Sequence, residues 1–197
     1  MDNMYKSNFF ALISRIKYIN RWSLMRNTRN ENLSEHSLEV AMIAHLLATI
    51  RNIRFGGNVD AEKCAVIAMY HDTTEIITGD LPTPVKYNNP DIKTAYKAVE
   101  AQACRQLLSY LPDDLKGVYS AILEPSDEYM EEKKLVKAAD KLSALIKCIE
   151  EDSMGNKDFR EAQKATMFSL HMMEIPEVQV FIDEFLDGYD LTLDEQT

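Results

Sequence analysis

Four side chains of metal-ligating type occupy informative positions in a chain dominated by helical periodicity. His36 and His71 each lie on the apolar side of a helical pattern, and Asp72 follows His71 directly. Asp140 borders the apolar stripe of a later helix. Ionisable side chains that face a helical core need a partner. A divalent metal ion would pair two neutral imidazoles and two carboxylates at once, so this set predicts a metal site.

Helical geometry limits how His71 and Asp72 can share one ion. Adjacent helical residues are about 100° apart in projection, so both can bind one ion only at the edge of their shared face. Each residue alone also has an ordinary interpretation. A helical histidine is usually a core or margin residue, and Asp140 between Lys137 and Lys141 could belong to a surface ion pair. The order of the four residues along the chain favours the joint interpretation.

The elements that must position these residues are helices, because apolar residues recur at steps of three and four. We expect helices over about 9–19, from Ser34 to a break at 55–58, from Asp60 to about Ile77, over 91–110, from about 113, and over 127–152, 158–173 and 177–187. Pro82 and Pro84 should exclude helix from the loop at 78–90. No alternating strand, repeat or linker interrupts the pattern. The sequence therefore predicts one all-α domain over residues 1–197, with about seven or eight helices.

Composition bounds the function and the compartment. The chain has 22 Lys and Arg against 32 Asp and Glu, a net charge of −10, which argues against a broad nucleic-acid-binding face. Six of the bases lie within the first 30 residues, so a local anion site can coexist with an acidic whole. Three cysteines without a CxxC pair, and no secretory leader, predict a cytoplasmic protein. The longest apolar run, at 40–50, is too short for a bilayer, which takes about 20 residues.

Five stretches of the chain resemble a known family. They are NRWSLMRN at 20–27, SEHSL at 34–38, AMYHDTTE at 68–75, GDLPTPVKY at 79–87 and LVKAAD at 135–140. The His-Asp pair is typical of the HD-domain superfamily of metal-dependent phosphohydrolases, and the chain most resembles its bacterial 5′-deoxynucleotidases of the YfbR type. The first and fourth stretches are far more specific than the His-Asp pair. Thr73 and Thr74 depart from the family's residue types but leave the ligand positions untouched.

The resemblance implies that His36, His71, Asp72 and Asp140 bind one divalent transition metal ion. Imidazole and carboxylate ligands suit Co, Mn, Ni, Zn, Fe or Cu, and the sequence does not choose among them. No histidine lies between His71 and His171, which is consistent with a single ion. The two other histidines have no place in this set, and we expect His45 to pack in the core and His171 to lie at the surface or its margin.

The resemblance also implies the substrate contacts. Arg21 would bind phosphate oxygens, and Trp22 would lie against the sugar, where an apolar wall disfavours a 2′-hydroxyl. His36 and the loop at 80–83 would also contact the substrate, the loop through Asp80, Leu81, Pro82 and Thr83. Catalysis would rest on Arg21, Glu75 and Asp80. The sequence does not decide which of the two carboxyl groups moves which proton.

The activity implied is hydrolysis of deoxyribonucleoside 5′-monophosphates to deoxyribonucleoside and phosphate, with broad base tolerance and a preference against ribonucleotides. The resemblance also implies a homodimer. Another HD hydrolase, acting on a nucleoside triphosphate or guanosine tetraphosphate, remains an alternative. Its additional phosphates would need further cations, and Arg15, Lys17, Arg26 and Lys86 are available. Less favoured alternatives are a binding module that does not turn over and a structural helical protein with an accidental His-Asp pair.

Overall fold

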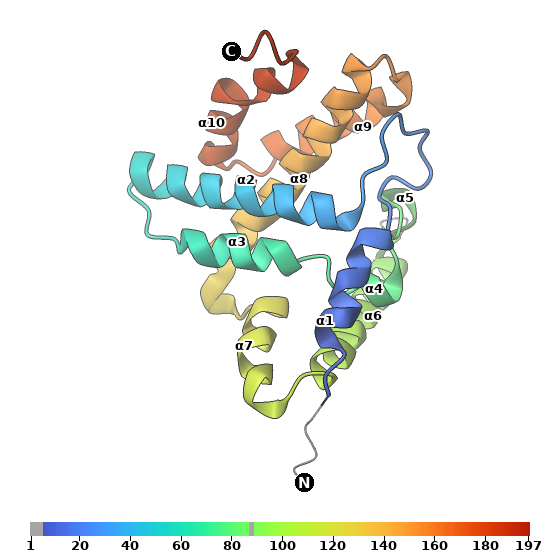
Figure 1. The fold of residues 1–197 in the computed structure, drawn as a ribbon. Helices are drawn as coiled ribbons and strands as arrows, with labels where there is room; N and C mark the ends of the chain where they lie inside the picture. The colour runs from blue at the N-terminus through green and yellow to red at the C-terminus, as the bar shows by residue number, and fades with distance from the viewer. Residues whose placement is uncertain (1–5, 87–88) are drawn as a thin grey trace. The chain divides into compact units, whose positions relative to one another are not determined.

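The computed structural model describes residues 6–86 and 89–197 and is all-α over those ranges (Figure 1). An isolated antiparallel bridge between Asn20 and Asn32 is the nearest approach to a strand in this part of the chain. The helices are α1 (Phe9–Ile13), α2 (Leu33–Arg54), α3 (Ala61–Tyr70), α4 (Glu75–Thr78), α5 (Thr83–Lys86), α6 (Pro90–Ser109), α7 (Asp113–Leu123), α8 (Met130–Ser153), α9 (Arg160–His171) and α10 (Pro176–Glu184). Seven described helices have nine or more residues, as the sequence predicts.

The chain divides into two compact units. The first consists of Met1–Leu24, Glu31–Ser37 and Tyr70–Glu128, and the second of Met25–Asn30, Leu38–Met69 and Tyr129–Thr197. The expectation of a single domain over 1–197 stays a prediction.

The core of the second unit is organised around α8. Its apolar stripe is buried as predicted, with Leu135, Leu142 and Ile146 almost fully shielded from solvent. This stripe belongs to a cluster with residues from α2, α3, α9 and α10. Helices α8 and α9 lie side by side (Figure 1). The spacing of three and four residues that predicts the helix is thus the spacing that places one face in the core.

Near the C-terminal end of α8, a buried carboxylate holds a loop of the same unit. Glu151 accepts hydrogen bonds from the Thr28 amide (2.9 Å) and the Thr28 hydroxyl (2.6 Å). The Asn156 side-chain amide donates to it at 2.7 Å, and Lys147 forms a buried ion pair with it. Burial acts to raise the pKa of Glu151, but these donors outweigh it and lower the pKa to about 2.

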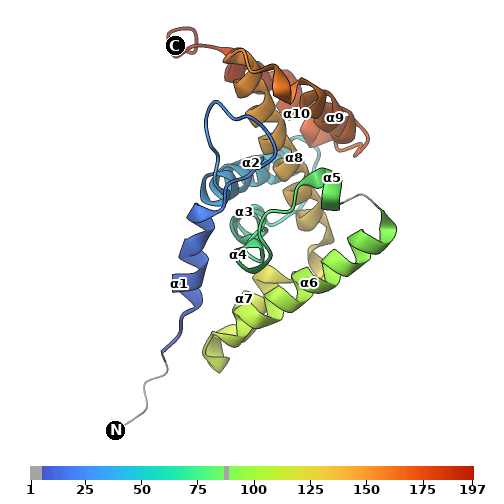
Figure 2. The same ribbon diagram turned by 90° about the vertical axis from the view of Figure 1, so that its right-hand side faces the viewer.

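The first unit has a smaller core around α6. Phe9, Leu107 and Leu111 are buried together there. The Tyr119 ring of α7 meets Phe9 edge to face, with ring centroids 5.1 Å apart. Helix α6 lies beside α4, α5 and α7 (Figure 2). This arrangement supports the segment at 71–86, which carries most of the candidate site residues of the unit.

The predicted continuation of the third helix to Ile77 is wrong, because α3 ends at Tyr70. The Thr73 amide donates to the Tyr70 carbonyl at 3.1 Å, and the Glu75 amide donates to the Asp72 carbonyl at 2.9 Å. These bonds span three residues, so tight turns replace the helical ladder. His71 and Asp72 therefore lie in a turn between α3 and α4, and the 100° separation of neighbouring helical residues does not apply to them.

Three further expectations need correction. The loop at 78–90 contains one helical turn, α5, because the Pro82 carbonyl accepts from the amides of Val85 and Lys86, and proline is tolerated in a first turn. Helix α2 begins at Leu33, one residue earlier than expected. His45 is exposed on α2, so it does not pack in the core, whereas His171 is exposed as expected.

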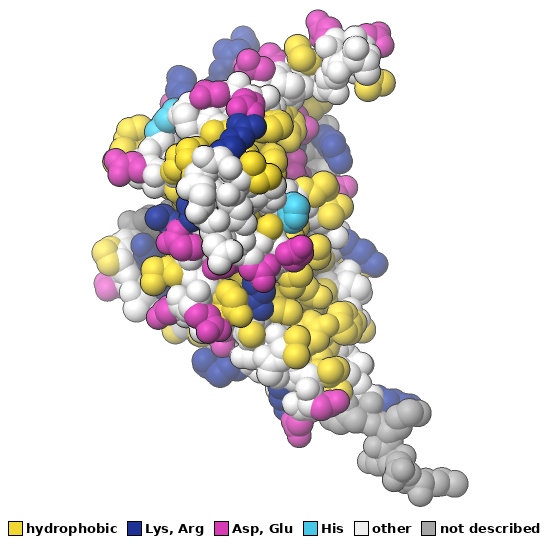
Figure 3. Space-filling model, turned by 90° about the vertical axis from the view of Figure 1, so that its left-hand side faces the viewer, with side chains coloured by type: hydrophobic (Ala, Val, Ile, Leu, Met, Phe, Trp, Pro, Cys, Tyr) yellow, Lys and Arg dark blue, Asp and Glu magenta, His cyan; other side chains and the backbone are white. Residues whose placement is uncertain are grey.

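The surface carries a mixture of side-chain types. Figure 3 shows acidic, basic and hydrophobic side chains interspersed on one face. None of the described helices combines the length with the apolar character that crossing a bilayer demands. Cys64, Cys104 and Cys148 are buried.

Candidate active site

The first turn of α2 brings His36 into the first unit. The Asn32 side-chain oxygen accepts from the Ser34 amide (2.9 Å) and the Glu35 amide (3.1 Å), which caps the helix one turn before the histidine. The His36 side chain is fully buried. Its ring is therefore oriented by the start of a regular helix rather than by a loop.

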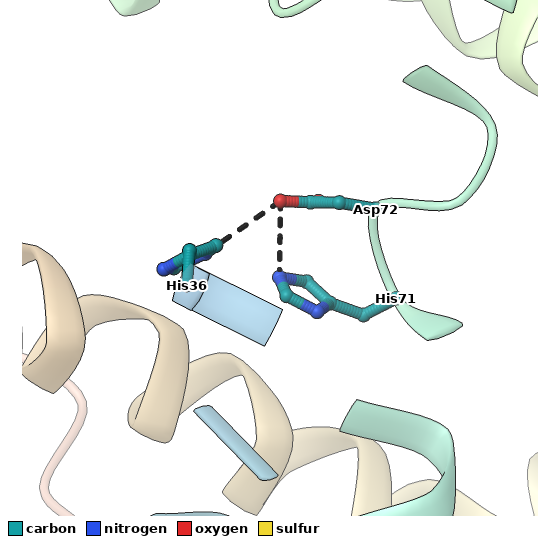
Figure 4. A group of neighbouring side chains, drawn as sticks. All are labelled: His36, His71 and Asp72. Atoms are coloured by element: carbon teal, nitrogen blue, oxygen red, sulfur yellow. Dashed lines mark ion pairs between the residues drawn. The ribbon is translucent and has the colours of Figure 1, made fainter. Parts of the chain in front are cut away.

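His36, His71 and Asp72 converge on one point (Figure 4). Asp72 Oδ2 lies 3.6 Å from His36 Nε2 and 3.2 Å from His71 Nε2. Ligand atoms about 2.1 Å from one tetrahedral ion lie about 3.4 Å from each other, so these two separations match two edges of a tetrahedral coordination shell. Two imidazole nitrogens and a carboxylate oxygen are also the donors that divalent transition metals prefer. The donor set therefore fits a divalent metal ion.

Arg21 lies against this cluster. Its Nη1 is 2.8 Å from His36 Nδ1 and donates to Glu31 Oε2 at 2.7 Å. The Arg21 and Glu31 side chains are mostly buried, with 12% and 13% of their surface exposed. A guanidinium beside a candidate metal site provides fixed positive charge, which suits the binding of an anion.

Trp22 has an unusual backbone conformation. Its φ of +58° lies in the left-handed region, which costs a non-glycine residue about 1–3 kcal/mol and is characteristic of functional sites. The indole Nε1 donates to Glu31 Oε2 at 3.2 Å. One carboxylate oxygen of Glu31 therefore accepts from two of the residues to which the family resemblance gives substrate contacts.

Glu75 is a buried carboxyl group at the start of α4. Burial and the negative charges of Asp72 and Asp80 raise its pKa to about 9, against the opposing charges of Lys86 and Arg21. Among the described residues, no group hydrogen-bonds to its Oε2, which is itself buried. These surroundings therefore favour the protonated form of the Glu75 carboxyl group.

Asp80 follows Gly79, whose φ of +72° favours glycine at that turn. Burial raises the pKa of Asp80, Arg21 opposes this effect, and Asp72 adds to it. Leu81 and Pro82 are half-buried. The side chain of Thr83, the last candidate in this loop, lies outside what the structure describes.

Comparison with known proteins decides the family. The model of the YfbR-like 5′-deoxynucleotidases matches residues 8–189. The chain belongs to this family. The 5′-deoxynucleotidase YfbR of Escherichia coli strains is 48% identical over 192 residues, which cover 98% of this chain and 96% of the relative. The predicted family and the predicted class of enzyme, a hydrolase of phosphoric monoesters acting on 5′-deoxynucleotides, are therefore confirmed.

Solved structures confirm the all-α HD fold of this YfbR-like chain. An HD-domain phosphohydrolase from Listeria innocua has a TM-score of 0.81 at 24% identity, covering 92% of this chain and 88% of that one. The cyanophage S-2L HD phosphohydrolase, whose structure holds dA and one catalytic Zn²⁺ ion, has a TM-score of 0.60 at 20% identity. The match covers 94% of this chain and 96% of the cyanophage protein.

The predicted site residues of this YfbR-like chain are not all in one unit. His36, His71, Asp72, Arg21 and the other candidates discussed above belong to the first unit. Asp140 lies on α8 in the second unit and is half-buried. Its part in metal binding stays a prediction.

Sequence reasoning missed a group of contacts that fixes the segment 79–86, which follows α4. The Tyr96 hydroxyl donates to the Gly79 carbonyl at 3.4 Å and lies 3.3 Å from Thr78 Oγ1. Lys86 forms an ion pair with Glu100 (2.9 Å), and its Nζ lies 4.7 Å from the centroid of the Tyr96 ring. Tyr96 and Glu100 are four residues apart on α6, so one helix face holds both ends of the segment 79–86. We call this segment the strap.

Glu31 was also missed. It lies in a loop ten residues after Arg21, where no helical period relates the two positions. Only the residue types in the sequence point to Glu31, since an acidic residue between an arginine motif and a histidine motif can pair with either. The sequence alone does not choose between that role and a solvated surface charge.

Proposed function

We propose that the chain hydrolyses deoxyribonucleoside 5′-monophosphates to the deoxyribonucleoside and phosphate. The observation that carries the proposal is the placement of Arg21 Nη1 2.8 Å from His36 Nδ1, beside the cluster of His36, His71 and Asp72. A guanidinium and a divalent metal site in contact form a cationic cradle that suits a phosphate monoester. The 48% identity to named 5′-deoxynucleotidases supports the same substrate class.

His36, His71 and Asp72 would hold the metal ion, and we assign the fourth ligand to Asp140 on the family resemblance. When bound, such an ion polarises a phosphoryl oxygen and orients water for attack on phosphorus. Co, Mn, Ni, Zn, Fe and Cu all suit these ligands, and the choice depends on geometry and supply. Arg21 would bind the phosphate oxygens and stabilise the negative charge that develops on them.

Glu75 is the residue that we assign to the leaving group. Burial and the neighbouring carboxylates raise the pKa of Glu75, which favours the protonated form that a general acid needs. A carboxylic acid in a buried site can give that proton to the departing 5′-oxygen. Asp80 would accept hydrogen bonds from the substrate or the attacking water, together with the loop residues Leu81, Pro82 and Thr83.

Trp22 would provide sugar selection. An apolar ring packed at C2′ leaves a 2′-hydroxyl without a hydrogen-bond partner and with little space. Because this selection uses no contact with the base, broad base tolerance follows. Ribonucleotides would be poor substrates for the same reason.

Phosphate release tests the proposal directly. Metal-stripped protein is supplied with one divalent ion at a time and offered dAMP, AMP and dATP side by side. We expect release from dAMP well above that from AMP and none from dATP. Equal release from AMP would contradict the proposed sugar selection by Trp22 but would leave the proposed phosphatase activity standing. Turnover of dATP alone would move the chain to the triphosphohydrolases, and no release from any of the three with metal bound would contradict the proposed activity.

The setting of the enzyme is part of the same proposal. We propose a cytoplasmic homodimer that acts on small nucleotides rather than on nucleic acid or membranes. The three buried cysteines, none of them in a CxxC pair, and the net charge of −10 support this setting. Light scattering on the purified full chain tests the assembly, and a monomer at micromolar concentration would contradict the dimer.

A further inference from the structure

One oxygen atom of Glu31 holds two residues of the proposed substrate site. Glu31 Oε2 accepts from Arg21 Nη1 at 2.7 Å and from Trp22 Nε1 at 3.2 Å. The Arg21 guanidinium carbon also lies 5.8 Å from the Trp22 ring centroid. The three side chains therefore form one connected group. In it, the single carboxylate of Glu31 orients both the Arg21 guanidinium and the Trp22 indole.

The backbone around Glu31 is built to bring it there. The Arg21 amide donates to the Glu31 carbonyl at 2.9 Å, and the Leu33 amide donates to the Ile19 carbonyl at 2.9 Å. Together with the Asn20–Asn32 bridge, these bonds pair the segments 19–21 and 31–33. The register of this pairing places the Glu31 side chain beside Arg21 and Trp22.

Trp22 needs such a partner because its own backbone does not favour the observed conformation. A φ of +58° is uncommon for a bulky residue and persists only where surrounding contacts impose it. The indole N–H is the donor through which Glu31 acts on this residue. Loss of the carboxylate would remove an acceptor from the indole and a counter-charge from the mostly buried Arg21.

We infer that Glu31 is a positioning residue that fixes Arg21 and Trp22 as a pair and, through Trp22, sets the discrimination between deoxyribose and ribose. This inference rests on the proposed function for its substrate. Its structural half, that Glu31 holds the indole, can be measured without any turnover.

Trp22 is the only tryptophan of the chain, so intrinsic fluorescence reports on it alone. The variants are Glu31→Ala, which removes the acceptor, and Glu31→Gln, which keeps an acceptor oxygen but no charge. Glu128→Ala is the matched control, because Glu128 is an exposed glutamate in the same unit. We expect Glu31→Ala to shift the emission and to increase quenching by acrylamide, while Glu31→Gln and Glu128→Ala stay close to the wild type.

The catalytic readout is the ratio of kcat/KM for dAMP to that for AMP in the metal-loaded enzyme. We expect Glu31→Ala to lower this ratio about tenfold, the scale of a hydrogen bond to a charged group. Glu31→Gln should retain most of the ratio but raise KM, because Arg21 loses its counter-charge. Trp22→Phe, which removes the indole N–H but keeps a ring, should not lower the ratio further in the Glu31→Ala background.

Unchanged Trp22 emission and quenching in folded Glu31→Ala would overturn the inference. So would a freed indole with an unchanged dAMP-to-AMP ratio. If Glu31→Ala does not fold by circular dichroism, Glu31→Gln decides, and an unchanged KM there contradicts the role in holding Arg21. A wild-type enzyme that releases no phosphate from dAMP would defeat the proposed function and the discrimination that rests on it, while the fluorescence would still decide whether Glu31 holds Trp22.

Discussion

At the scale of the residue, the site depends on carboxyl groups in contrasting environments. Asp72 lies between two imidazoles, whereas Glu75 is buried at the start of α4 with negative charges around it. The first can offer an oxygen to a cation beside both imidazoles, and the raised pKa of the second favours its protonated form. The roles proposed for Asp72 and Glu75 can be tested separately.

Asp72→Ala should leave a folded helical protein that binds little metal and has almost no turnover. The change removes the oxygen that lies near both His36 Nε2 and His71 Nε2, so one of the four proposed ligands, and its negative charge, is lost. Metal content after dialysis and phosphate release from dAMP measure the effect. Asp114→Ala, at an exposed position of the same unit, is the control. Full activity in Asp72→Ala would contradict the proposed metal site.

Glu75→Gln should change how the stability of the metal-free protein depends on pH. The folded pKa of about 9 lies above the ordinary value of 4.5, so the folded state binds the proton more tightly than the unfolded state does. Between these values, wild-type stability falls as pH rises, and the neutral glutamine removes that fall. The free energy of unfolding, measured in EDTA at pH 5, 7 and 9, should therefore rise for Glu75→Gln relative to the wild type as the pH increases. A constant difference across this range would mean that the carboxyl is ionised throughout.

At the scale of the element, the point at which α3 ends decides what the site can do. Had the helix continued through His71 and Asp72, their side chains would diverge by about 100°. The turn at 71–74 instead lets both approach one point (Figure 4). The strap, 79–86, then depends on α6 for its position, because Tyr96 and Glu100 contact its two ends.

Tyr96→Phe and Glu100→Gln should each loosen the strap. The first removes the hydroxyl that donates to Gly79, and the second removes the partner of Lys86. We expect faster amide exchange at 79–86 and a fall in kcat/KM for dAMP of about threefold to tenfold, mainly through KM, since half-buried polar contacts are of this strength.

The exposed ion pair of Asp113 and Lys116 on α7 supplies the control for the strap. Asp113→Asn removes an exposed lysine–carboxylate pair of the same unit and should change neither exchange at 79–86 nor KM. If Glu100→Gln behaves like this control, the contact between Lys86 and Glu100 does not position the strap.

How far the sequence predicts these elements depends on whether local signals or distant contacts decide them. The buried stripe of α8 and the break after α2 follow from apolar spacing and from Gly56 and Gly57. The end of α3 does not, because no glycine or proline lies between Asp60 and Gly79 and the apolar pattern continues to Ile77. The turn there is fixed by hydrogen bonds that no spacing encodes. The same holds for Glu31, whose partners become neighbours only through the pairing of two loop segments.

At the scale of the whole molecule, the acidic composition makes the stability of the protein at low pH an informative quantity to measure. The chain carries 32 acidic residues, and most of those on the surface contribute little to stability by their ion pairs. Glu151 differs because it is fully buried and is held by Lys147, Thr28 and Asn156. Protonation of Glu151 should therefore destabilise the folded protein more than protonation of an exposed carboxylate does.

Glu151→Gln should destabilise the protein at pH 7 and flatten its response to acid. The folded pKa of about 2 lies below the ordinary 4.5, so the stabilisation is present above about pH 4.5 and is lost as pH falls toward 2. A shift of this size corresponds to about 3 kcal/mol. Urea unfolding at pH 7, 4 and 3 measures it, and the wild type should approach the variant as pH falls. Glu161→Gln, which removes an exposed partner of Lys164 in the same unit, should leave all three values nearly unchanged. Parallel curves for the wild type and Glu151→Gln down to pH 3 would show that the buried carboxylate does not govern acid stability.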